Sequence, residues 1–366
     1  MYSSKIAEQF LRLVRLGIGN GTSRRVVIPQ NIDWGQIKAL ADAQGLSAVV
    51  LDGLDKCHTD NTESTEMLPL QMKLEWIGDV LQNYEVRYKA YEKAISSLAG
   101  FYNSYGYKMM VLKGYACSLN WPKPEHRPCG DIDIWQFGQY READAALSKE
   151  KGIKMDNSHH HHTVFWWSDF MVENHYDFVN VYHSKSNAAI EKEFKTLGAG
   201  DSHYVELNGE KVYLPSSNLH ALFLLRHSMT EFAAGCINIR QLLDWAFFVK
   251  KYGKDVDWEW LESRLEEYGM TRLYDVFNAI CVGDLGFDVS MFPRVQFDPS
   301  LKHRVLNEIL FPATPNEIPI KLLQRVVWKW RRWKANGWKH KLVYKESMWS
   351  AFWSGVWSHL LKPKSI

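Results

Sequence analysis

The chain has 366 residues, of which 46% are hydrophobic and 23% are charged, and its formal net charge at pH 7 is +2. This length suffices for two or three domains, and the composition is that of a folded globular protein, which excludes a fibrous or disordered chain. Because the charges nearly cancel, the whole chain is also excluded as a general binder of polyanions.

Cysteine usage and the first residues indicate a reducing compartment. The five cysteines are scattered and none forms a Cys-x-x-Cys pair, so the sequence predicts neither a disulfide framework nor a structural zinc site. Residues 1–8 lack the apolar core of a signal peptide, and the chain has no uncharged apolar run of about 18 residues. We therefore expect a cytoplasmic protein without a transmembrane helix.

Residues 1–100 are predicted to form a mainly helical region. Apolar side chains recur at helical spacing from Trp34 to Gly45, where the glycine is a typical helix stop. A longer helix is predicted from Met72 to Leu98, and we expect it to pack beside a sheet. Its apolar stripe comprises Leu74, Ile77, Leu81, Tyr84, Tyr88, Tyr91, Ile95 and Leu98.

Two acids alternate with apolar residues in the segment Asp131-Ile132-Asp133-Ile134-Trp135, and this period of two predicts a half-buried strand. Residues two apart on a strand project from the same face, so the carboxylates of Asp131 and Asp133 lie close enough to repel each other. A cation between them removes that repulsion. Magnesium is the natural choice, because it prefers oxygen ligands and keeps positions open for phosphate oxygens.

The alternative for such a pair is a solvated face of an edge strand. Three features favour a site instead. The residues between and after the acids are apolar, a glycine (Gly114) follows an apolar strand over residues 107–112, and a third acid, Glu173, lies in the strand-like segment 171–176. The sequence therefore predicts three carboxylates on one sheet.

These residues, in this order, resemble a known family. The chain contains Leu112-Lys113-Gly114, Trp121-Pro122, Arg127, Asp131-Ile132-Asp133-Ile134 and Glu173-Asn174-His175. The set is similar to the bacterial uncharacterised nucleotidyltransferase family, within the DNA polymerase β-type nucleotidyltransferase superfamily. The resemblance covers about residues 100–250 of this sequence.

The resemblance implies transfer of a nucleoside monophosphate from an NTP to a hydroxyl of a small molecule or protein. It implies two Mg²⁺ ions held by Asp131, Asp133 and Glu173, with Glu173 also helping to deprotonate the acceptor hydroxyl. The nucleotide-binding residues that it implies are Lys113, Gly114, Ser118 and Arg127.

The turn after Lys113 departs from the superfamily pattern. Many members have Gly-Ser there, whereas Tyr115 follows Gly114 in this chain, and Ser118 is out of register. This departure keeps open a second hypothesis, a catalytically degenerate binding or scaffold protein on the same fold.

Histidines near the third acid are further candidates. Adjacent strand residues alternate sides, so we expect at most one functional histidine in the run from His159 to His162, with His162 nearest the predicted strand and a surface loop as the alternative. His175 shares the face of Glu173 and either lines the site or packs structurally.

Asp177, His227 and Asp244 are further polar residues in predicted strands and helices. Asp177, four residues after Glu173, is an alternative third acid, although the family pattern favours Glu173. For His227 and Asp244, on predicted helices, we favour helix packing or capping.

The remaining pattern completes an α+β fold, in which a small mixed nucleotidyltransferase sheet is flanked by helical regions at both ends. Residues 140–150 are predicted to form a helix and residues 206–214 a hairpin on the turn Asn208-Gly209. Residues 217–285 are again helical. We expect a nucleotidyltransferase-like domain at 101–215, a helical domain at 216–310 and a C-terminal helical segment at 311–366.

Residues 321–366 contain eleven lysines and arginines, one glutamate and seven of the sixteen tryptophans. Basic residues among aromatics suit nucleic acid, an anionic membrane surface such as the inner face of the bacterial membrane, or a packed terminal layer. Nucleic acid is disfavoured because the rest of the chain carries a net negative charge. Trp349, Trp353 and Trp357 form one helical stripe, which keeps packing and membrane contact both open.

Overall fold

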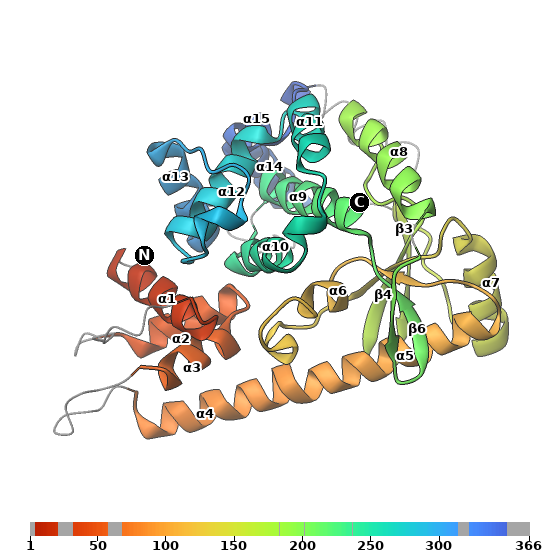
Figure 1. Ribbon diagram of the computed structural model, residues 1–366, viewed down its shortest axis with the longest axis horizontal. Coiled ribbons are helices and arrows are strands. Elements are labelled where there is room, and N and C mark those ends of the chain that lie inside the picture. The colour runs from red at the N-terminus through yellow and green to blue at the C-terminus, as the bar shows by residue number, and fades with distance from the viewer. Residues whose placement is uncertain are drawn as a thin grey trace.

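The computed structural model describes residues 4–20, 32–57, 68–182, 184–200, 202–235, 237–313 and 322–349. A mixed sheet lies between a long helix on one side and a group of C-terminal helices on the other, with three N-terminal helices at the far end of the long helix (Figure 1). The α-helices are α1 (Ser4–Gly17), α2 (Trp34–Ala43), α3 (Ser47–Asp55), α4 (Leu70–Val80), α5 (Arg87–Ser104), α6 (Tyr115–Ser118), α7 (Tyr140–Lys151), α8 (Lys185–Ala199), α9 (Ser217–Ala234), α10 (Ile239–Tyr252), α11 (Trp258–Tyr268), α12 (Thr271–Gly283), α13 (Pro299–Leu310), α14 (Leu322–Ala335) and α15 (Gly337–Val343).

The sheet has six strands in the order β3-β4-β2-β1-β6-β5. The pairs β2–β4 and β1–β6 are parallel, and the other neighbours are antiparallel. The predicted fold class, α+β with a mixed sheet flanked by helices, is confirmed. The strands are β1 (Met110–Val111), β2 (Ile132–Trp135), β3 (His162–Trp167), β4 (Phe170–His175), β5 (Tyr204–Leu207) and β6 (Glu210–Tyr213).

The alternation in β2 decides which face of the sheet carries the acids. Ile132 and Ile134 belong to a buried cluster that also contains residues of α5 and α7. Asp133 and Trp135 project from the opposite face, where Trp135 packs against Phe178 with ring centroids 4.9 Å apart. The predicted period of two is confirmed, and it turns Asp133 away from α5.

Helix α4 continues through a π-helical turn, Leu81–Val86, into α5, so the predicted long helix is confirmed. The predicted stripe is wrong in its first half, because Leu74, Ile77 and Leu81 are 56%, 42% and 52% exposed. Trp76 and Val80 are buried instead. The wider π turn, with hydrogen bonds from i to i+5, shifts the buried face between the two halves of the helix.

The hairpin and the crossing helix also follow the prediction. Asn208 and Gly209 have φ angles of 51° and 83° between β5 and β6, the left-handed pair that an Asn-Gly hairpin turn requires. The hairpin extends the sheet, because β6 pairs with β1. Helix α7 ends at Gly152, whose φ of 65° is left-handed.

The C-terminal segment packs on the body as far as the structure describes it. Leu342, Val343 and Tyr344 are buried, and the Trp338 ring packs edge-on against Phe232 with centroids 5.7 Å apart. This favours the terminal-layer interpretation for residues 337–344. Trp349 is 56% exposed, while Trp353 and Trp357 lie outside the described residues, so membrane contact stays a prediction. Among the helices that the structure describes, none has the length and apolar character to span a bilayer.

His220 on α9 gives the fold a pH-dependent stability. Burial lowers the pKa of this imidazole from 6.5 to about 4. The unfolded chain therefore binds more protons than the folded chain between these pH values, and acidification below about pH 6.5 destabilises the fold by about 1.4 kcal/mol per pH unit for this group. We expect urea unfolding of His220→Gln to show a shallower loss of stability between pH 7 and pH 5 than the parent; equal slopes would contradict this assignment.

Candidate active site

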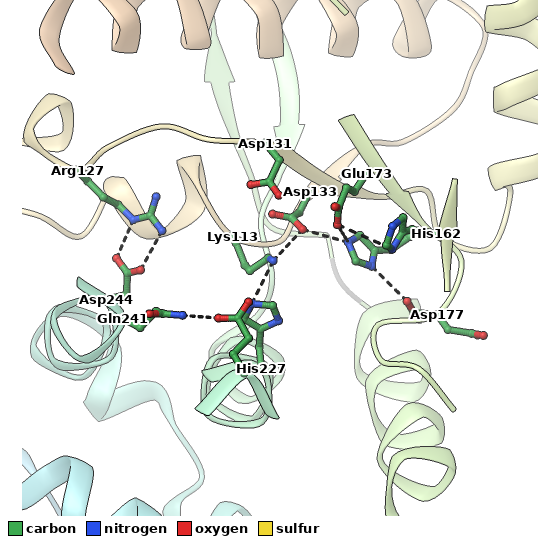
Figure 2. Close-up of polar contacts among 12 residues, drawn as sticks. Lys113, Arg127, Asp131, Asp133, His162, Glu173, Asp177, His227, Gln241 and Asp244 are labelled. Atoms are coloured by element: carbon green, nitrogen blue, oxygen red, sulfur yellow. Dashed lines mark hydrogen bonds and ion pairs between the residues drawn. The ribbon is translucent and has the colours of Figure 1, made fainter. Parts of the chain in front are cut away.

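Strand register brings Asp133 and Glu173 together. Parallel pairing of β2 with β4 places these two residues directly side by side, and neighbouring strands are about 4.8 Å apart. Asp131, one residue before β2, lies beside Asp133 (Figure 2). Burial and the Asp133 carboxylate raise the pKa of Asp131, which is the expected effect of two like charges in a confined space. The three predicted acids therefore occupy one region of the sheet.

Two cations already contact Asp133. The ammonium Nζ of Lys113 lies 2.9 Å from Asp133 Oδ1, and His175 Nε2 lies 3.1 Å from the same oxygen. Burial alone would raise the pKa of Asp133, but Lys113 and His175 outweigh it and hold the value well below the usual range. Asp133 and Glu173 raise the pKa of His175 to about 9 against its burial, so His175 is charged at neutral pH.

Helix α9 closes the site from the helical side. Lys113 Nζ also lies 3.2 Å from His227 Nε2, and the same His227 atom is 2.9 Å from Glu231 Oε1. Burial would raise the pKa of Glu231, yet His227 and Lys113 lower it to about 2. Helix packing or capping is the favoured interpretation of His227; its ring contacts Glu231 on its own helix and also the predicted nucleotide-binding lysine.

Histidines of the β3 entry lie on the other side of Glu173. His162 Nδ1 is 3.9 Å from Glu173 Oε2, and the ring centroids of His162 and His175 are 5.2 Å apart. His161 is also present, with its ring centroid 5.5 Å from that of His175. Two histidines of the run therefore lie near His175, and the expectation of at most one functional histidine in the run stays a prediction. His161 lies in a bend before β3, where side chains do not follow strand alternation.

The donor set fits a divalent cation. Ligand atoms of Asp133, Glu173 and His175 all lie within 4.8 Å of one another. The two carboxylates suit Mg²⁺ or Mn²⁺, Asp131 adds a third carboxylate beside them, and the imidazole suits a softer ion.

Arg127 is placed apart from the acids. Its Nε and Nη2 atoms lie 2.8 Å and 2.9 Å from the two carboxylate oxygens of Asp244, and both side chains are buried (Figure 2). Asp244 also accepts a hydrogen bond of 2.8 Å from the Trp121 indole. The guanidinium is thus bound to α10, and its contact with a triphosphate stays a prediction. The packing interpretation of Asp244 is confirmed.

The turn after Lys113 is built for packing. Gly114 has a φ of 48°, and a Cβ there would overlap the hydroxyl of Tyr91. That hydroxyl donates a hydrogen bond of 2.8 Å to the main-chain oxygen of Asp131, so the glycine allows Tyr91 to fix the start of β2. Ser118 Oγ contacts the Tyr88 hydroxyl at 2.9 Å and donates to the Tyr115 carbonyl, away from the acids.

Asp177 does not join the acids. Strand β4 ends at His175, so strand alternation no longer governs Asp177, and its carboxylate pairs with Lys195. Only its main-chain oxygen is near the site, 3.3 Å from His175 Nδ1. Glu173 is therefore the third acid that the structure brings to the aspartate pair. The neighbours that the sequence did not indicate are His161, His227 and Glu231.

A cavity of about 640 Å³ adjoins this cluster. His161, His227 and Glu231 line it on the side of the acids, and the rest of its wall comes from α8, α9, the loop after β4, and the segment from α14 through α15 to Met348. That wall combines aromatic and basic side chains: Phe178, Trp328, Lys329, Arg332, Trp333 and Tyr344.

Comparison with known proteins gives one match. Residues 30–282, more than half of the chain, match the sequence profile of the family described as Uncharacterised nucleotidyltransferase. No curated protein matches the chain, and no solved structure matches it.

Proposed function

We propose, on the premise that this chain belongs to the uncharacterised nucleotidyltransferase family, that it transfers a nucleoside monophosphate from an NTP to a hydroxyl group with the help of Mg²⁺. The observation that carries the proposal is the register of β2 and β4, which sets Glu173 beside Asp133 on the face that meets α9. The acceptor is a small molecule or a protein side chain.

In this proposal Asp131, Asp133 and Glu173 would hold two Mg²⁺ ions, which would supply charge compensation for the phosphate oxygens and acidify the attacking hydroxyl. The acceptor oxygen forms a bond to the α-phosphorus, the bond from that phosphorus to the bridging oxygen breaks, and pyrophosphate leaves. Glu173 accepts the hydroxyl proton. His175 lowers the pKa of Glu173 against the effect of burial, so the carboxylate is ionised and ready for this role at neutral pH.

The proposal gives Lys113 a second partner, the triphosphate, in addition to Asp133. Its ammonium is a mobile point charge on a flexible stem, and it lies between Asp133 and His227. Asp133 would hold Mg²⁺ in the proposed reaction, and the Lys113 ammonium would then contact the triphosphate.

The acceptor occupies the cavity beside the acids. Its volume of about 640 Å³ suits a small molecule or the end of a protein segment, and His227 and Glu231 face it from the side of Lys113. The aromatic and basic wall contributed by α14 then gives the C-terminal segment a part in the site.

A non-catalytic binding role is the second candidate, and one observation favours it. Lys113 and His175 already balance the charge of Asp133, so the carboxylate needs no metal ion to be stable in its buried position. In that case the chain binds an NTP without releasing pyrophosphate.

Three variants test the proposal through pyrophosphate release with each of the four NTPs. Asp131→Ala and Glu173→Gln are expected to lose Mg²⁺-dependent release, whereas Asp177→Asn, a matched acid outside the cluster, is expected to keep it. Asp131→Ala is also expected to remain at least as stable as the parent, because the loss relieves repulsion with Asp133.

Thermal shifts with NTP, with and without Mg²⁺, separate the remaining outcomes. A parent chain that is stabilised by an NTP but releases no pyrophosphate supports the non-catalytic role. A parent chain that shows neither effect overturns both candidates.

A further inference from the structure

Three histidines lie beside the acids. Ligand atoms of His161, His162 and His175 all fall within 4.8 Å of one another. The ring centroids of His161 and His162 are 4.4 Å apart, and those of His162 and His175 are 5.2 Å apart. The proposed transfer uses the carboxylates and gives His161 and His162 no task.

The backbone fixes this arrangement. His162 is the first residue of β3 and is paired directly with His175, the last residue of β4. The bend that holds His161 is anchored by its main-chain oxygen, which accepts hydrogen bonds of 3.0 Å and 3.1 Å from the amides of Tyr176 and Asp177. Strand pairing and the anchored bend therefore bring the three rings together.

Three buried ring nitrogens of His161 and His162 have no hydrogen-bond partner among the described residues. The His162 side chain is 7% exposed, and neither of its ring nitrogens has a hydrogen-bond partner among the described residues. His161 Nδ1 is also buried and unpartnered there. A buried polar atom without a partner costs about 1–3 kcal/mol. Because buried polar groups are nearly always satisfied, these unpartnered atoms indicate a ligand, and one ion can complete one nitrogen of each ring.

The chemistry of the donors selects the ligand. Neutral imidazole nitrogens suit borderline ions such as Zn²⁺ and Co²⁺, whereas Mg²⁺ prefers the oxygens of the neighbouring carboxylates. Glu173 Oε2 lies 3.5 Å from His175 Nε2, so Glu173 can supply a fourth ligand from its present position on β4. The adjoining cavity, which His161 also lines, provides a path of entry.

We propose that His161, His162 and His175 form a binding site for a transition-metal ion of the Zn²⁺ class, next to the carboxylates. His175 would release its proton to solvent and exchange its contact with Asp133 for the ion, which leaves Asp133 to Lys113. The site shares Glu173 and His175 with the proposed transfer, but it binds its ion whether or not an NTP is present, so its test needs no nucleotidyl transfer.

The test uses the full chain without an added histidine tag, stripped of metal with a chelator and titrated with Co²⁺. We expect one equivalent to bind with the visible absorption of a nitrogen-ligated ion, and Zn²⁺ to displace it. His162→Gln should weaken binding by at least about 100-fold, the upper end of the loss seen when a residue behind a metal ligand is removed.

Two controls make the result specific. His159→Ala removes a histidine that is 44% exposed in the same run and should leave Co²⁺ binding unchanged. Asp131→Ala should lose pyrophosphate release but keep the Co²⁺ spectrum, so failure of the transfer and failure of the metal site are told apart. Equal weakening by His159→Ala and His162→Gln would mean tag-like binding by the run and would overturn the site, as would a parent chain that binds no Co²⁺.

Discussion

Asp133→Ala is expected to abolish pyrophosphate release and to destabilise the fold in the same step. Loss of a metal-holding carboxylate removes several kcal/mol of charge stabilisation from the reaction, which corresponds to a fall in rate of at least about 1000-fold. The fold loses about 3–5 kcal/mol, because the ammonium of Lys113, only 18% exposed, keeps a buried charge without its partner at 2.9 Å. Urea unfolding and a pyrophosphate assay measure the two effects on the same preparation.

A double variant separates the two effects. In Lys113→Met/Asp133→Ala the unpaired ammonium is gone, so most of the lost stability should return while pyrophosphate release stays absent. If Asp133→Ala alone is as stable as the parent, the buried ion pair does not hold Lys113 as described. If that single variant still releases pyrophosphate, the proposed transfer is refuted.

Asp244→Ala is expected to produce the largest loss of stability outside the candidate active site. It deprives the buried Arg127 of two hydrogen bonds, of 2.8 Å and 2.9 Å, and Trp121 of its acceptor at 2.8 Å. An unpaired buried guanidinium costs about 3–5 kcal/mol. The fall should appear as a lower urea midpoint with an unchanged slope.

The matched control replaces both charges. Arg127→Met/Asp244→Leu keeps the volume but removes the buried charges, so we expect much of the stability to return. This variant also tests the predicted contact of Arg127 with the triphosphate. If Arg127 acts only as a partner of Asp244, the double variant keeps the NTP-dependent thermal shift of the parent. Loss of that shift in a folded double variant would assign Arg127 to the nucleotide.

The sequence predicted those parts of the fold that follow from local patterns. The period of two around Asp131 and Asp133, the turn Asn208-Gly209 and the helical spacing before Gly152 are each readable within a few residues, and all three are confirmed. The exposed first half of the long helix was not predictable in this way. A π turn leaves the apolar spacing unchanged while it rotates the face that packs.

The sequence predicted only those residues of the candidate site that strand alternation and the family pattern identify. Asp133, Glu173 and His175 share a face because of alternation on β2 and β4, and a family pattern adds the order of the motifs. His161 was not expected at the site, because strand alternation was applied to the whole histidine run although His161 lies in a bend before β3. His227 and Glu231 come from a helix about 100 residues later, and no local spacing indicates which side of that helix meets Lys113.

The partner of Arg127 shows the same limit. The family resemblance implies that Arg127 binds phosphate, but Asp244 lies 117 residues further along the chain and accepts hydrogen bonds from the Nε–Nη2 edge of its guanidinium. Which anion an arginine contacts depends on tertiary packing. A sequence pattern can only state that an anion is needed.

The continuous helix from Leu70 to Ser104 packs into two separate buried clusters. The change from one cluster to the other occurs at the π turn. Trp76, Val80 and Tyr84 belong to the cluster of the terminal helices, whereas Tyr88, Tyr91 and Ile95 belong to the cluster beneath the sheet. Because one continuous helix belongs to both clusters, unfolding of either cluster also disrupts helical hydrogen bonds in the other. Amide exchange in both halves should therefore report a single cooperative opening event, so that damage at either end lowers the protection of the whole molecule.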